Sequence, residues 1–224
     1  MQDNSSGSRK PSSETSAGKL AFRGTPLAEW TESLTSARGG EDLLDRILSP
    51  ADAAELVPQL PVDDLYAHCR AIGLADADPV LALASNEQVR ALLDSDGWDR
   101  DELKVERMDP WLNALMRCGP DVLGPKLLSL DDSILTELLK SSTEVLVIED
   151  PENFDAPDVE HVRTPDGALC VCFPESATRD LPIKIFLDWL MRTDSAHCIN
   201  LLVFSASALS SNLQEDAYRW RQAR

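Results

Sequence analysis

The sequence predicts a mainly α-helical protein of the α+β class, in which a small β element is inserted among short helices. Three observations carry this prediction. Apolar residues recur at helical spacing between residues 26 and 142. Runs of β-branched residues then appear near 144–173, and helical spacing returns from about residue 180. We therefore expect an array or irregular bundle of short helices, with a β-hairpin or small sheet near 144–173.

The chain divides into three regions by composition. Residues 1–25 are rich in Ser, Gly and charged residues, with almost no apolar residue before Leu20, which predicts a disordered tail. Residues 26–142 are expected to form the helical array. Residues 143–224 are expected to add the small β element and the C-terminal helices, and to pack on the array as one globular unit.

Capping residues and prolines indicate where the helices of the array begin. A short polar residue before an apolar run favours a helix start, and Pro is tolerated in the first turn. Trp111 and Leu112 begin the apolar face of the sharpest predicted helix, which Gly119 closes. The expected caps are Ser49 with Asp52, Ser85 with Gln88, and Asp109 before Pro110.

Two strands are expected after residue 142. Glu144–Glu149 is a continuous β-branched run, and Ala168–Phe173 follows the turn signal Pro165–Gly167. Between them, Asp150–Val159 is rich in Pro and Asp and is expected to be a loop. The two runs predict a hairpin or a small sheet.

The C-terminal part of the chain is expected to be helical again. Ile183, Phe186 and Leu190 share one helical face, and a last helix from about residue 211 pairs Glu215 with Arg219. Trp220 is expected to pack inward, and a helix that binds a partner is the alternative interpretation of Tyr218–Arg221. The last helix reaches the end of the sequence without a stop signal, so we expect the chain to be a fragment of a longer protein.

Charge and composition limit the function classes. The formal net charge is −18, which repels phosphate backbones, so nucleic-acid binding is not expected and basic proteins or cations fit better as partners. A charge that serves only solubility is the simpler interpretation. No apolar run approaches the roughly 18 residues of a membrane span, so no membrane insertion is expected. The five cysteines are scattered in apolar segments, which favours reduced thiols and a cytoplasmic protein.

An acidic cluster is the candidate cation site. Carboxylate oxygens suit Mg²⁺ or Ca²⁺, but a calcium loop needs carboxylates at positions 1, 3 and 5, Gly at position 6 and Glu at position 12. Counting from Leu92 places Gly97 at position 6 but Leu92 and Leu103 at positions 1 and 12, and counting from Asp94 places Asp99 at position 6 and Val105 at position 12, so both registers fail. A solvated loop that caps helices is the alternative interpretation. The candidate metal ligands are Asp94, Asp96, Asp99, Asp101 and Glu102.

The other chemistry-bearing residues give weaker patterns. Cys170 and Cys172 share one face of a strand and, with His197 and Cys198, would supply four zinc ligands, although plain core thiols are the alternative. The two histidines His68 and His161 lie in no nucleophile motif, and the sequence contains no P-loop, G-x-S-x-G or H-E-x-x-H pattern. No catalytic residue and no other cofactor is predicted.

Two resemblances add to this interpretation. Residues 48–61 are similar to the opening of the cytosolic helical superhelix of bacterial magnesium transporters. Over roughly residues 40–224 the chain resembles an uncharacterised bacterial family of unknown function, whose members look longer than this chain. The stretches that carry the second resemblance are Gln88–Asp94 followed by Gly97–Asp99, Trp111–Leu112, and Glu215–Arg221.

The function expected from these observations is a non-catalytic protein-interaction or scaffold module. Helical arrays expose extended concave surfaces that suit protein partners, and no chemical motif points to a reaction. The alternative is an acidic regulatory domain that responds to a cation or another ligand, and an unrecognised enzyme is a third. The partner, the ligand and the oligomeric state are not predicted.

Overall fold

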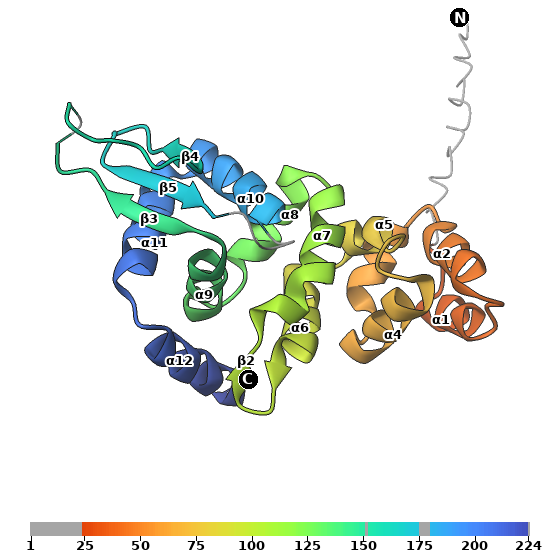
Figure 1. Ribbon diagram of the computed structural model, residues 1–224. Helices are drawn as coiled ribbons and strands as arrows, with labels where there is room; N and C mark the ends of the chain where they lie inside the picture. The colour runs from red at the N-terminus through yellow and green to blue at the C-terminus, as the bar shows by residue number, and fades with distance from the viewer. Residues whose placement is uncertain (1–23, 151, 175–179, 224) are drawn as a thin grey trace, which may run out of the picture.

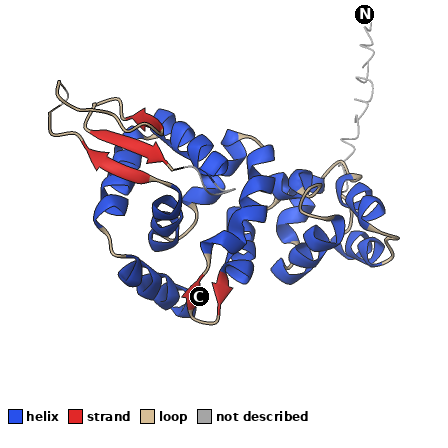
Figure 2. Ribbon diagram, in the orientation of Figure 1, coloured by secondary structure: helices blue, strands red, loops and turns tan. Residues whose placement is uncertain are grey.

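The computed structural model describes residues 24–150, 152–174 and 180–223, and it is mainly helical with small antiparallel sheets (Figures 1 and 2). The first half contains α1 (Leu27–Thr35), α2 (Gly40–Leu48), α3 (Ala53–Leu56), η1 (Val57–Gln59), α4 (Val62–Ile72), α5 (Asp78–Leu83), α6 (Asn86–Gly97), β1 (Trp98–Asp99), β2 (Glu102–Leu103) and η2 (Val105–Met108). The second half contains α7 (Asp109–Arg117), α8 (Pro120–Leu128), α9 (Asp132–Ser142), β3 (Glu144–Val147), β4 (Glu160–Arg163), β5 (Leu169–Phe173), α10 (Asp180–Thr193), α11 (Ser195–Ser207) and α12 (Ser210–Ala223).

The expected tail lies mostly outside the described residues, because the described chain begins at residue 24. Thr25, which the prediction assigned to that tail, is tied to the body. Its backbone N–H and its hydroxyl donate to the two carboxylate oxygens of Asp52, at 2.8 and 2.9 Å. The bond from the backbone N–H is the main cause that holds the pKa of Asp52 below its usual value, and the bond from the hydroxyl adds to it.

One of the three expected helix caps is confirmed. The Ser85 hydroxyl accepts the Gln88 backbone N–H at 3.1 Å, and the Gln88 side chain accepts the Ser85 N–H at 2.8 Å, which is a complete capping box. The buried Gln88 amide also donates to the carbonyls of Val57 and Leu60, so this cap fastens η1 to α6.

The other two caps are wrong. Ser49 ends α2, where its hydroxyl donates back to the carbonyl of Arg46 at 3.2 Å, and Asp52 is held by Thr25 instead of completing a box. Asp109 is already the first residue of α7, because the turn η2 leads directly into that helix and moves the N-cap position to Met108. The spacing of residues near each helix start could not reveal the distant partner of Asp52 or the turn η2 that precedes α7.

The predicted β element is a three-stranded antiparallel sheet with the order β3-β5-β4. The central strand β5 pairs with β3 on one side and with β4 on the other. Val171 of β5 lies opposite Val145 of β3 and opposite Val162 of β4. The strand β4 was not predicted, because the expected loop ended at Val159 and Glu160–Arg163 has no apolar alternation that would indicate a strand. It forms because an exposed edge strand needs only backbone pairing, which polar side chains do not prevent.

A second, two-stranded sheet was not predicted. β1 and β2 form a short hairpin that follows α6 directly and pairs Trp98 with Leu103. Arg100, at the turn, has a φ of 60°, a left-handed conformation that is uncommon outside Gly. The two strands are too short to leave a periodic pattern in the sequence.

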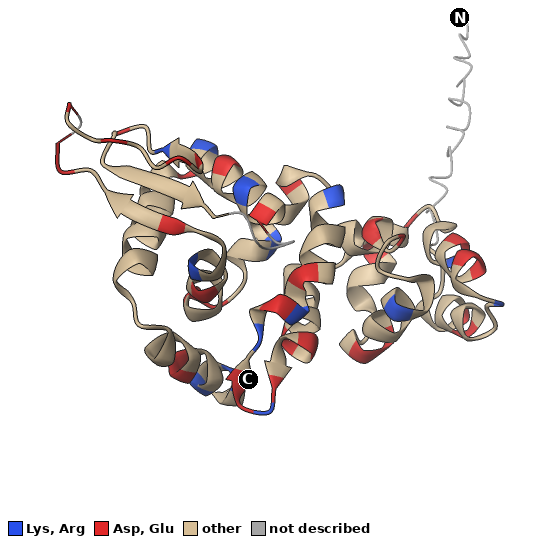
Figure 3. Cartoon of the chain, in the orientation of Figure 1, with Lys and Arg blue, Asp and Glu red and all other residues tan. Residues whose placement is uncertain are grey.

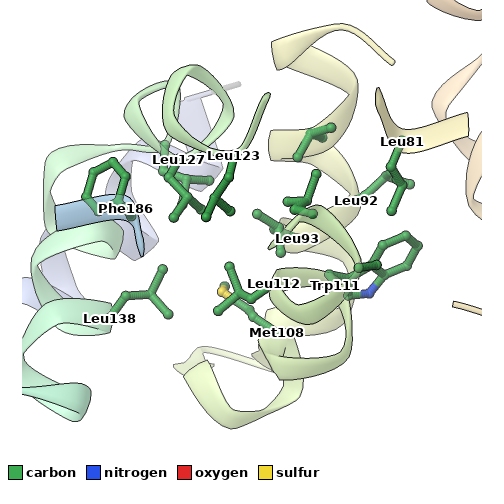
Figure 4. Close-up of a cluster of buried hydrophobic side chains, with 14 of the residues drawn as sticks. Leu81, Leu92, Leu93, Met108, Trp111, Leu112, Leu123, Leu127, Leu138 and Phe186 are labelled. Carbon is green, nitrogen blue, oxygen red and sulfur yellow. The ribbon is translucent and has the colours of Figure 1, made fainter. Parts of the chain in front are cut away.

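One buried hydrophobic cluster extends from the first helices to the last. It includes Trp30 of α1 and Ala217 of α12. Members of the cluster that come from α5 to α10 and η2 are labelled in Figure 4: Leu81, Leu92, Leu93, Met108, Trp111, Leu112, Leu123, Leu127, Leu138 and Phe186. The helices that precede the three-stranded sheet in the chain therefore share one core with the helices that follow it.

A close approach between α8 and α10 makes a testable prediction at Gly124. A Cβ atom placed there would lie 2.3 Å from ring atoms of Trp189. Ala is intrinsically better in a helix than Gly by about 1 kcal/mol, but overpacking of this kind costs about 1–3 kcal/mol. We expect Gly124→Ala to lower the free energy of unfolding, measured by urea denaturation.

The control for Gly124→Ala is the same substitution in a Trp189→Ala background. Without the indole ring the steric conflict is gone, so the helix propensity of Ala should make the substitution stabilising there. An equal loss of stability in both backgrounds would show that the contact with Trp189 is not the cause.

Candidate functional site

The candidate functional site is a groove between α9, α11 and α12, with a cavity volume of about 350 Å³. We call it the α11–α12 groove. Its lining residues are Asp132, Ser133, His197, Asn200, Leu201, Phe204, Leu213, Asp216 and Trp220. Two large aromatic side chains at the groove are open to solvent, Phe204 at 49% and Trp220 at 60% exposure. The expectation that Trp220 packs inward is therefore wrong.

Helix α11 supplies the apolar wall of the groove and carries no charge. Residues 195–214 contain no Asp, Glu, Lys or Arg, in a chain of which 27% of the residues are charged (Figure 3). One side of α11 packs into the core through Cys198, Leu201 and Leu202. Its other side leaves Val203 and Phe204 about half exposed. A helix that is apolar on both sides normally has neighbours on both sides.

Helix α12 supplies the opposite wall and is held in place by its inner face. Leu213 and Ala217 are buried, and the Tyr218 ring lies 6.1 Å from that of Trp98 in β1. The Arg221 guanidinium lies 5.1 Å from the centroid of the Trp98 ring and donates to the carbonyl of Arg100 at 3.1 Å. Figure 1 accordingly shows α12 ending beside the β1–β2 hairpin. Trp220 remains exposed because the inner positions are already filled.

Lys140 of α9 fixes the end of α11. Its ammonium group donates to the carbonyls of Ser205 and Ala208, at 3.3 and 2.7 Å. Cations at the C-terminus of a helix satisfy its last carbonyls and favour the helix dipole. The Phe204 side of the groove is therefore positioned by a polar contact as well as by packing.

The edges of the groove carry carboxylates. Asp132 and Asp216 are exposed, and Arg219 pairs with Glu215 at 2.5 Å, as expected from the sequence, and with Asp216 at 3.6 Å. Ser133 is buried, and its hydroxyl has no hydrogen-bond partner among the described residues. The surroundings of the two aromatic rings are thus acidic overall.

The five candidate metal ligands are divided among a helix, two strands and a turn. Asp94 and Asp96 belong to the last turns of α6, Asp99 to β1, Asp101 to the turn that follows and Glu102 to β2. Asp99 pairs with Arg107 at 3.1 Å, and Glu102 pairs with Lys104. Over residues 24–150, 152–174 and 180–223, no three His, Cys, Asp or Glu side chains are grouped so that they could hold a metal ion. A Mg²⁺ or Ca²⁺ site here stays a prediction.

Asp96 is the best-connected carboxylate of that set. It accepts the Tyr66 hydroxyl at 2.7 Å and the Trp111 indole N–H at 2.6 Å, and Arg70 lies 3.9 Å away. The hydrogen bond to Asp96 is the main cause that raises the pKa of Tyr66, followed by burial. These contacts join α4, α6 and α7, so Asp96 has a structural role in the folded chain.

The four expected zinc ligands are divided between two parts of the structure. Cys170 and Cys172 do share a face of β5, with their sulfur atoms 3.9 Å apart, but Cys198 belongs to the main core. All five cysteines are free thiols, and burial is the main cause that raises the pKa of Cys172 and Cys198 to about 11 and that of Cys69 to about 12. Such thiols stay protonated at neutral pH and are poor nucleophiles.

The histidines have ordinary surroundings. Burial is the main cause that lowers the pKa of His68, and the nearby Asp64 opposes that shift. His161 contacts the carbonyl of Val159 at 2.9 Å through Nδ1. His197, which the sequence offered only as a zinc ligand, lies in the wall of the α11–α12 groove.

Comparison with known proteins places the chain in a family. The family described as "Family of unknown function (DUF6178)" matches residues 20–224. The chain belongs to DUF6178. The match begins before residue 40, the start of the expected resemblance, and so includes all the described helices. No curated protein and no solved structure matches the chain. The likeness of residues 48–61 to magnesium transporters finds no support in these comparisons.

The DUF6178 chain offers one site that the sequence interpretation missed. Asp216 and Trp220 of the groove fall in the terminal stretch Glu215–Arg221, and His197 was considered only as a zinc ligand, so the lining was not recognised as one site. The absence of charge over residues 195–214 was the available signal, because interface cores are depleted of charged residues. No helix of the part of the chain that the structure describes is both long and apolar enough to cross a membrane.

Proposed function

We propose that this chain is a non-catalytic protein-interaction module that binds a cationic, partly apolar segment of a partner protein in the α11–α12 groove. The observation that carries the proposal is the pair of exposed rings, Phe204 and Trp220, on opposite walls of one groove. Aromatic residues are enriched among the few side chains that dominate binding energy at interfaces.

Charge supports this choice of partner. The chain has a net charge of −18, and Asp132 and Asp216 lie at the groove itself. Lys and Arg side chains of a partner would be attracted over a long range and would pair at the rim, whereas phosphate groups would be repelled.

The proposal is tested with a fluorescent, helix-forming peptide of alternating Lys and Leu blocks, whose binding is measured by fluorescence anisotropy. We expect Phe204→Ser combined with Trp220→Ser to weaken binding at least about tenfold, because side chains of this kind commonly contribute well over 1 kcal/mol. The matched control is Val147→Ser, since Val147 is 63% exposed on β3, outside the groove. That variant should bind the peptide as the parent does.

Two further probes separate the groove from general charge attraction. A peptide in which Glu replaces Lys should bind the parent protein far more weakly. A Lys-rich peptide without Leu should bind the groove variant and the Val147→Ser control with equal affinity. Equal binding by the parent and the groove variant would overturn the proposal. Self-association that the groove variant abolishes, measured by analytical ultracentrifugation, would instead identify a second copy of this chain as the occupant.

A further inference from the structure

A second hollow lies on the other side of α11, between the sheet and α10. Its cavity volume is about 240 Å³. A dry apolar cavity of about 150 Å³ is large enough for benzene, so this space suits a small apolar group. The apolar residues that line it are Val162, Val171, Phe173, Leu187, Met191 and Leu202. We call this hollow the β4–α10 pocket.

The pocket lies between the edge strand β4 and one side of α10 that carries both apolar and charged side chains. Lys184, Leu187, Asp188 and Met191 recur along one side of that helix and line the pocket. The neighbouring positions Ile183, Phe186 and Leu190 are fully buried in the core instead. The row that faces β4 therefore combines apolar side chains with one cation and one anion, a helical turn apart.

The cation is held against the pocket wall. The Lys184 ammonium lies 4.8 Å from the centroid of the Phe173 ring and 2.5 Å from one carboxylate oxygen of Glu160. The Lys184 side chain is only 26% exposed, so a partner would bind it away from bulk water. An ammonium group has three donors, and these two contacts leave donor capacity for another acceptor.

The anion lies at the more open side of the pocket. Asp188 accepts from Arg192 at 2.5 Å, and its side chain is 68% exposed. A carboxylate can accept several hydrogen bonds, so Asp188 can accept one from a ligand without losing Arg192. The pocket therefore presents a donor cation, an acceptor anion and an apolar cavity next to one another.

We infer that the β4–α10 pocket binds a small zwitterion with an apolar side group, the chemistry of a free hydrophobic amino acid. The carboxylate of the ligand pairs with Lys184, its ammonium group pairs with Asp188, and its side group fills the cavity against Val171, Met191 and Leu202. A zwitterion has no net charge, so the acidic chain does not repel it as it repels simple anions.

The charge pattern separates this ligand from its closest alternatives. A simple carboxylate would use Lys184 or Arg163, the second cation of the lining, but it would also lie near the carboxylates of Glu160 and Asp188. A simple amine would use Asp188 but would meet the ammonium of Lys184. A ligand with both charges places an opposite charge beside Lys184 and another beside Asp188, in addition to the ion pairs that these two groups form with Glu160 and Arg192. This inference is independent of the proposed partner groove, which shares no lining residue with the pocket.

Isothermal titration of the full chain with L-leucine and L-phenylalanine tests the inference. We expect saturable binding of at least one of them, and none of glycine, which has no side group for the cavity. Isocaproate lacks the ammonium group of leucine and isopentylamine lacks its carboxylate. Each analogue should bind at least about tenfold more weakly, since each loses one charge-assisted hydrogen bond.

Variants locate the binding. Lys184→Met and Asp188→Asn should each weaken amino-acid binding at least about tenfold, whereas Asp132→Asn, in the other groove, should leave it unchanged. Absence of saturable binding to both amino acids would overturn the inference, as would equal binding of either singly charged analogue. Binding that survives both pocket variants would place the ligand elsewhere and overturn it too.

Discussion

Trp111→Ala is expected to lower the free energy of unfolding by about 3–5 kcal/mol, the range typical of large buried aromatic side chains. Trp111 is 1% exposed, and its ring centroid lies 5.7 Å from that of Tyr66. Its indole N–H donates to Asp96, which also accepts the Tyr66 hydroxyl. The substitution would therefore create a cavity and leave a carboxylate with one donor fewer.

Urea denaturation followed by far-UV circular dichroism measures this effect, and two variants interpret it. Trp111→Phe keeps most of the ring but loses the N–H, so it should cost less than Trp111→Ala. Trp220→Ala removes the same side-chain type at a site that is 60% exposed, and should change stability by no more than about 0.5 kcal/mol. A loss for Trp111→Ala as small as that for Trp220→Ala would contradict the core position of Trp111.

Phe186→Ala is expected to have a similar cost, about 3–5 kcal/mol. Phe186 is fully buried in α10 and its ring stacks on that of Trp189 at 6.4 Å. It belongs to the same hydrophobic cluster as Trp111 and Leu112 of α7 (Figure 4). Because that cluster joins helices from both halves of the chain, the whole fold should lose stability together.

Two probes of unfolding distinguish a joint loss from a local one. Circular dichroism, which reports all helices, and tryptophan fluorescence should give coincident transitions for the parent and for Phe186→Ala. Phe204→Ala is the matched control, since Phe204 is 49% exposed, and its transition should move little. Separate transitions by the two probes would show that the halves unfold independently.

The sequence was informative where local patterns decide the structure. The helical faces around Trp111 and Phe186 and the turn at Pro165–Gly167 need only short-range spacing. The strand β4 was missed because an edge strand is stabilised by backbone pairing to β5, which leaves no apolar alternation in Glu160–Arg163. The cap at Asp52 was misassigned because its partner, Thr25, is distant in sequence.

The candidate site was harder to predict than the fold, because its residues come from three helices. Asp132, Phe204 and Trp220 meet only when α9, α11 and α12 pack, and nothing in the spacing of the sequence brings them together. The acidic cluster at Asp94–Glu102 attracted attention because its members are adjacent in sequence. In the folded chain Asp96, Asp99 and Glu102 each have a donor of their own.

The burial of the thiols has a practical consequence for work on this protein. Cys69, Cys172 and Cys198 are buried and have raised pKa values, so they hold very little of the thiolate that alkylating reagents attack. A cysteine introduced at an exposed position such as Trp220 would react far faster than these three. A spectroscopic probe can therefore be attached beside the α11–α12 groove while the cysteines of the core are left in place.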